Sequence, residues 1–184
     1  YGARQPVFGW TVEHPAGLVV VATGLLDSTP ALDRTYRPVP HPEWLPRDVV
    51  AVVPTHLHFD HCGGNRLYPG IPIHVQAREL AGARAGQADT VVEWVDFDGA
   101  EYVEHDGEGE VLAGIRLLPA PGHTPGHQVV VVDTAEGPNV LAGDVAYSFR
   151  ELGAGATEGR RRVLELGALT WLGHAARPKI PERR

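Results

Sequence analysis

The sequence predicts an α/β domain, because β-branched apolar runs alternate with segments of helical character and metal-binding residue types follow the runs. Runs typical of buried strands occupy residues 48–53, 115–120, 129–132, 140–142 and 169–172. Residues 76–85 and 157–166 are predicted to be helices. Histidine or aspartate follows several of the strands, and the carboxyl ends of strands are where α/β proteins gather their ligands.

The remaining elements are predicted from the positions of glycine and proline. Residues 1–24 predict a hairpin that turns at Pro15-Ala16-Gly17, and residues 71–75 predict a strand before the first helix. Residues 25–47 contain five prolines and predict an irregular loop, whereas residues 86–110 are acidic and glycine-rich and predict short strands and turns. In the second helix, Thr157 is the expected N-cap, and Arg160 to Arg162 are expected on its solvated face.

Length and composition predict a single domain over residues 1–184, although the natural N-terminus can lie upstream because the chain begins with Tyr1. The net charge of −7 argues against a nucleic-acid partner, and no apolar run reaches the length of a membrane span. Cys62 is the only cysteine, which excludes an internal disulfide and, with no visible signal peptide, favours a cytoplasmic location. Nothing in the sequence indicates the oligomeric state.

The densest chemical motif is the run from Thr55 to His61, which places His56, His58, Asp60 and His61 within six residues. Imidazole suits zinc and similar metals, and a carboxylate adds an oxygen donor. Because alternate residues of an extended segment point the same way, His56, His58 and Asp60 can converge while His61 turns toward a second ion. Chance histidines in a surface turn rarely reach this density, so the run predicts a metal site. Cys62 is expected to be a small packing residue.

Three further donors follow predicted strands: His123 in a Gly/Pro-rich loop, Asp144 after Gly143, and His174 at the end of the last run. Taken alone, Asp144 fits a turn carboxylate and His174 a surface histidine. Their repeated placement after strands, together with the first cluster, favours metal ligation for both. His127 is expected to support a ligand and not to bind metal itself.

These motifs resemble the metallo-β-lactamase superfamily, in their order and over nearly the whole chain. The resemblance implies an αββα four-layer sandwich and a hydrolase with two divalent metal ions, expected to be zinc. One ion would be held by His56, His58 and His123, the second by Asp60, His61 and His174, and Asp144 would bridge them.

Within the superfamily the first motif is similar to that of the quorum-quenching N-acyl homoserine lactonases. Leu57 and Phe59 match, Gly63-Gly64-Asn65 follows, and Tyr147 stands three residues after Asp144. The implied reaction is the opening of a small lactone by a metal-bridging hydroxide. Tyr147 would donate to the oxyanion, and Asp60 would carry the proton to the leaving oxygen. A lone loop tyrosine is otherwise a packing residue.

One departure keeps alternatives open. The hairpin of this family normally ends in Asp-Thr-Gly, and here Ala22 takes the position of the aspartate. Losing a carboxylate that supports metal ligands can lower metal affinity or activity about 10–100-fold. Ala22 therefore makes a metal-binding member with weak or no catalysis an alternative. A glyoxalase-II-type thioesterase is a further alternative, because it would use the same ligand set.

Overall fold

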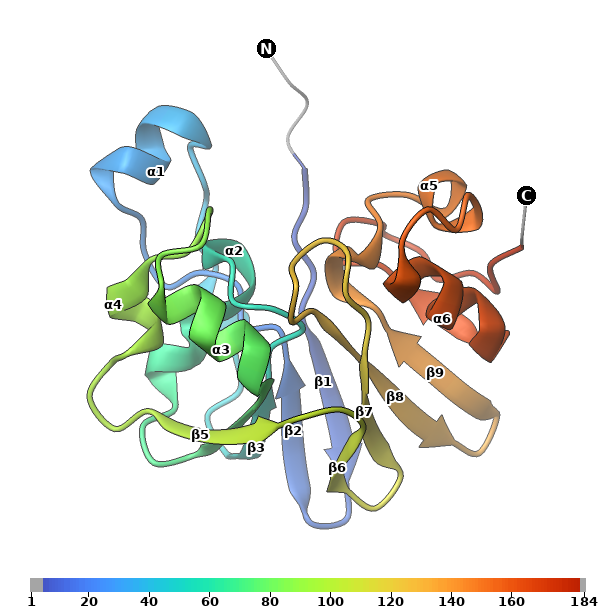
Figure 1. The fold of residues 1–184 in the computed structure, drawn as a ribbon. Helices are drawn as coiled ribbons and strands as arrows, with labels where there is room; N and C mark the ends of the chain where they lie inside the picture. Colours follow the sequence, from blue (N-terminus) through green and yellow to red (C-terminus); the bar gives the residue numbers. More distant parts are fainter. Residues whose placement is uncertain (1–4, 183–184) are drawn as a thin grey trace.

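The computed structural model describes residues 5–182 and contains two five-stranded sheets packed face to face. Helices cover the outer face of each sheet, so the layers run αββα as the resemblance implies (Figure 1). The first sheet has the strand order β1 (Trp10–His14), β2 (Gly17–Val21), β3 (Val49–Val53), β4 (Pro72–Gln76) and β5 (Glu101–His105). The second has the order β10 (Leu169–Trp171), β9 (Gly137–Leu141), β8 (Gln128–Thr134), β7 (Ile115–Pro119) and β6 (Gly109–Leu112).

The two sheets are built differently. In the first, β1 and β2 form the predicted hairpin and the remaining neighbours are parallel. In the second, β6 to β9 are antiparallel neighbours, and β10 adds in parallel beside β9. The strands predicted from 48–53, 71–75, 115–120, 129–132, 140–142 and 169–172 are all confirmed, with ends that differ by a few residues.

The core between the sheets is made by short β-branched and leucine side chains. Val21 and Val53 of the first sheet pack against Leu117 and Val130 of the second, and all four are buried. Val21 pairs with Val53 across the parallel ladder, so alternate residues of both strands point into this layer. This packing brings the carboxyl ends of β3, β7, β9 and β10 close enough for their loops to meet.

The helices before residue 100 lie on the side of the first sheet, and those after residue 145 lie on the side of the second (Figure 1). On the first side are α1 (Pro30–Thr35), α2 (Phe59–Cys62), α3 (Ala77–Arg84) and α4 (Val92–Val95), with short 3-10 turns at Pro42–Trp44 and Gly63–Leu67. On the second side are α5 (Phe149–Gly153) and α6 (Glu158–Leu166). The predicted helices 76–85 and 157–166 correspond to α3 and α6, and Thr157 caps α6 by accepting from the Arg160 amide.

Three predictions about local structure were wrong in part. Residues 86–110 contain the short helix α4 as well as the predicted strands and turns. Residues 25–47 are not wholly irregular, because Pro30 occupies the first turn of α1 and Thr29 caps that helix. Proline is tolerated there because the first N–H of a helix has no backbone carbonyl partner within the helix. The arginines of α6 do not all face solvent either. Only Arg161 is exposed, whereas Arg160 and Arg162 donate to the carbonyl oxygens of Val145 and Pro119.

No helix within residues 5–182 is long and apolar enough to cross a membrane.

Candidate metal centre

Each predicted ligand lies on a segment that follows a strand, and four such segments meet at one edge of the sandwich. His56 follows β3, and His58 is the N-cap of the short helix α2 that carries Asp60 and His61. The other three donors follow β7, β9 and β10, and are His123, Asp144 and His174. The structure therefore confirms the prediction that these donors follow the ends of strands.

All seven predicted ligands come together in three overlapping groups, in each of which the donor atoms lie within 4.8 Å of one another. The groups are His56, His58 and His123; His56, His61 and Asp144; and Asp60, His61 and His174. His127 belongs to none of them, although its ring centroid lies 5.2 Å from that of His56. The group that contains Asp144 shares His56 with the first group and His61 with the third, so Asp144 lies between them.

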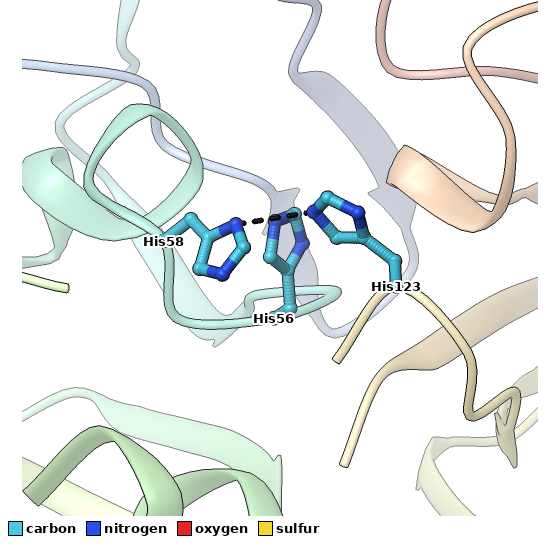
Figure 2. A group of neighbouring side chains, drawn as sticks. All are labelled: His56, His58 and His123. Atoms are coloured by element: carbon cyan, nitrogen blue, oxygen red, sulfur yellow. Dashed lines mark hydrogen bonds between the residues drawn. The ribbon is translucent and has the colours of Figure 1, made fainter. Parts of the chain in front are cut away.

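The first group joins the two halves of the molecule. His56 and His58 project from one loop and His123 faces them from the other (Figure 2). His58 Nδ1 and His123 Nε2 are 3.1 Å apart, and the His56 ring packs edge-on against both other rings. Three imidazole nitrogens that converge in this way form a donor set typical of zinc sites.

Asp144 contacts histidines of both sets. Its Oδ1 lies 3.2 Å from His61 Nε2, and its Oδ2 lies 3.0 Å from His174 Nε2 and 3.7 Å from His123 Nε2. His174 Nδ1 lies 2.6 Å from the Pro6 carbonyl oxygen, so this nitrogen donates and Nε2 is left to face the centre. Asp60 Oδ2 lies 3.7 Å from His61 Nε2.

Close backbone packing fixes these loops. A Cβ on Gly143, whose φ is +51°, would collide with the Thr55 hydroxyl, and a Cβ on Gly173 would collide with Asp144 Oδ1. Thr23 N donates to the His61 carbonyl oxygen over 2.9 Å, which ties helix α2 to the end of β2. Ala22, at the position where the family has aspartate, is buried with a φ of +55°.

Burial keeps four histidines neutral. Desolvation lowers the pKa of His56, His58 and His123 below the usual value, and it lowers the pKa of His127 to about 3. Neutral imidazole is the form that offers a lone pair to a metal ion. The first group is therefore ready to bind a cation at neutral pH without losing a proton.

The charges around Asp144 behave differently. Burial opposes charge on both Asp144 and His61, but their attraction prevails: the pKa of Asp144 is held far below its usual range, and the pKa of His61 rises to about 9. Burial likewise opposes the cationic form of His174, yet its hydrogen bond to Asp144 raises the pKa. Metal ions at this side of the centre would displace protons from His61 and His174.

The donor set fits divalent cations because several buried polar atoms have no other partner. In the described part of the chain, His56 Nε2, both ring nitrogens of His61, and Asp144 Oδ1 are buried and make no hydrogen bond. Leaving such atoms unpaired costs about 1–3 kcal/mol each. Coordination would satisfy His56 Nε2, Asp144 Oδ1 and one nitrogen of His61, so the residues present suit a metal centre.

Tyr147 lies beside the centre. Its ring stacks on His174 with centroids 5.1 Å apart and meets His123 edge-on at 5.7 Å. Burial and the nearby carboxylates of Asp144 and Asp60 raise the pKa of Tyr147 to about 12, so the phenol remains a donor at neutral pH. Cys62 is buried in an apolar cluster with Leu57 and Val75, as expected for a packing residue.

Sequence reasoning missed the residues that hold Tyr147. The Glu151 carboxylate accepts from Tyr147 N over 2.9 Å and pairs with Arg160, which in turn donates to the Val145 carbonyl oxygen over 3.0 Å. A glutamate and an arginine nine residues apart spanning a helix boundary carry no local signal of such a role. Their partners become apparent only in the folded chain.

Comparison with known proteins gives consistent results. An N-acyl homoserine lactonase from a Bacillus species is 30% identical over 164 residues, covering 78% of this chain and 65% of the relative. The enzyme of the same name from Bacillus thuringiensis is 29% identical over 156 residues, covering 74% and 62%. The chain thus spans about two-thirds or slightly less of the length of these relatives.

A solved structure of a quorum-quenching N-acyl homoserine lactone hydrolase superposes with a TM-score of 0.73 at 26% identity, covering 92% of this chain and 80% of that one. The sequence model of the metallo-beta-lactamase superfamily matches residues 5–180, which include all seven donors. With the αββα layers and the donor loops already in place, the chain belongs to the metallo-beta-lactamase superfamily.

Proposed function

We propose that this domain hydrolyses a small lactone, such as an N-acyl homoserine lactone, at a centre that holds two divalent metal ions. The convergence of seven histidine and aspartate donors from four strand-end loops is the observation that carries the proposal. The proposed ligands are His56, His58 and His123 for one ion and Asp60, His61 and His174 for the other, with Asp144 shared. The lactone itself is proposed because two curated relatives and one solved structure carry that activity in their names.

When bound, divalent ions supply Lewis-acid polarisation of a carbonyl oxygen and activate water as a nucleophile near neutral pH. Side chains of the protein stabilise the oxyanion and transfer the proton. Tyr147, neutral up to a pKa of about 12, donates a hydrogen bond to the oxyanion that develops on the attacked carbonyl. Its stacking on His174 keeps the phenol beside the centre.

Asp60 handles the proton. Its carboxylate is partly exposed and lies 3.7 Å from His61 Nε2. It takes the proton released as water adds to the carbonyl carbon, and passes it to the ring oxygen as the carbon–oxygen bond of the lactone breaks. The product is the ring-opened hydroxy acid.

The substrate is tested by steady-state kinetics of the Zn²⁺-loaded protein on matched lactone and thioester panels, and on a β-lactam. We expect lactones to have the highest kcat/KM. Tyr147→Phe should lower kcat about 10²–10³-fold with metal content unchanged, because one oxyanion donor is lost. Faster thioester turnover with a neutral Tyr147→Phe would favour the glyoxalase-II-type alternative. A fully loaded protein without turnover on any panel would favour the member with weak or no catalysis.

A further inference from the structure

A buried glutamate outside the proposed ligand set connects the two loops of the first donor group. Glu79 lies in the first turn of α3, and only 1% of its surface is exposed. The proposed chemistry does not use this carboxylate. A carboxylate removed from water is costly unless several donors satisfy it, so its partners indicate why it is there.

The two oxygens of Glu79 accept hydrogen bonds from different ligand loops. Oε1 accepts from the backbone amide of Leu57 over 2.9 Å, and Leu57 stands between His56 and His58. Oε2 accepts from the Thr124 hydroxyl over 2.6 Å, and Thr124 directly follows His123. One side chain therefore touches the loop after β3 and the loop after β7, which belong to different sheets.

Packing at the same place supports this connection. A Cβ on Gly126 would collide with the backbone nitrogen of Glu79, so the loop that carries His123 is seated against the first turn of α3. The third hydrogen bond of Glu79, from Gln87 Nε2 over 3.1 Å, comes from outside both ligand loops. Gln87 therefore offers a control that perturbs Glu79 without cutting either loop contact.

We infer that Glu79 is a positioning residue that sets the distance between the His56–His58 pair and His123, and so determines the affinity for the ion they hold. The inference rests on the ligand assignment under the proposed function. His58 and His123 face each other across only 3.1 Å, so a small shift of either loop changes the donor geometry. The second ion, held by Asp60, His61 and His174, has no ligand on the Thr124 loop and should be little affected.

The test is Zn²⁺ affinity, measured by competition with a chromophoric chelator, in two backgrounds. His174→Ala weakens the second set and reports the first ion, whereas His123→Ala weakens the first set and reports the second ion. Adding Glu79→Ala should lower affinity about 10–100-fold in the His174→Ala background, the size typical of lost ligand support. It should leave affinity unchanged in the His123→Ala background.

Three further variants keep the test decisive if Glu79→Ala folds poorly. Glu79→Gln should bind Zn²⁺ nearly as the wild type does, because its amide oxygen can accept from Leu57 and its NH₂ can donate to Thr124. Thr124→Val cuts only one loop contact and should weaken the first ion. Gln87→Ala should change neither ion.

Equal weakening of both ions, or no weakening in the His174→Ala background, would overturn the inference. A wild-type protein that binds fewer than two Zn²⁺ would instead refute the ligand assignment, and the wild-type titration alone reveals that outcome.

Discussion

At the scale of single residues, the centre is organised around one carboxylate. Asp144 is 3% exposed and contacts His61, His174 and His123, so it touches histidines of both proposed sets. His127 is equally buried, but it belongs to none of the three donor groups. Both residues are buried near the donor groups, but only Asp144 is a member of one.

We expect Asp144→Ala to reduce both metal content and kcat/KM more than His127→Ala does. Losing Asp144 removes a donor from both proposed ions and leaves the buried His61 and His174 rings without their anion. His127 should act only through the packing of neighbouring ligands. Metal analysis and kinetics on the same samples give the comparison. Equal losses of activity in the two variants, with metal content unchanged, would contradict this ranking.

The convergence of the candidate ligands could be predicted because each carries its own chemical signal after a recognisable strand. Glu79, Glu151 and Arg160 could not, because their roles depend on partners distant in the sequence or in another element. Glu79 touches Leu57 and Thr124, which lie 22 and 45 residues away. A helix examined alone shows only an acidic residue in its first turn.

At the scale of elements, the segment from Asp144 to Tyr147 is held by the two helices that follow it. Arg160 of α6 donates to the Val145 carbonyl oxygen, and Glu151 of α5 accepts from Tyr147 N. The Glu151–Arg160 ion pair links these two contacts. The proposed bridging carboxylate and the proposed oxyanion donor thus share one scaffold.

We expect Arg160→Ala to lower kcat about 10–100-fold on lactones, because small misplacement of reacting groups is costly even when the changed residue is remote. Two zinc ions should still bind, since no ligand is removed. The control is Arg161→Ala on the exposed side of the same helix, and it should leave kcat unchanged. An Arg160→Ala enzyme with wild-type kcat would show that the segment holds its position unaided.

A second element-scale feature lies between β4 and β5, away from the metal donors. His74 Nδ1 and His105 Nε2 are 3.0 Å apart on adjacent strands. Burial lowers the pKa of His105, and burial together with His105 lowers the pKa of His74 to about 4. Between pH 6.5 and 4 the unfolded chain therefore binds more protons than the folded one, so the stability from this pair is full near pH 7 and falls on acidification.

We expect this loss to reach about 1–2 kcal/mol, after the pKa shift of a partly exposed ring is discounted for solvent screening. The measurement is the free energy of unfolding in denaturant at several pH values, with chelator present so that metal binding does not contribute. His74→Gln should show a shallower loss of stability between pH 7 and 4 than the wild type. Parallel pH profiles for the two proteins would show that the pair does not titrate on unfolding.

At the scale of the whole molecule, the order of strands and donors could be predicted, while the irregular parts could not. Valine-rich runs define β3 and β8 from local sequence alone. The helix α1 was missed because prolines at 30, 38, 40 and 42 suggested a loop, although a proline at the first helical position is favourable when Thr29 caps it. The proline content of residues 25–47 as a whole favoured a loop, although residues 30–35 form a helix.

The sandwich also explains why the centre joins distant parts of the chain. Packing Val21 and Val53 against Leu117 and Val130 brings together strand ends from two sheets. The candidate donors, which are spread from His56 to His174 in the sequence, therefore meet at one edge. Cavities or shifts in this shared layer would therefore change the metal centre as well as stability. The proposed hydrolysis requires that these seven donors bind two metal ions.

The most direct test is elemental analysis of the folded protein after Zn²⁺ reconstitution and removal of excess metal. We expect about two ions per chain, as in two-metal hydrolases, with a cooperative unfolding transition that confirms the fold. A well-folded sample that retains only traces of zinc, and of any other divalent ion supplied in its place, would contradict the account.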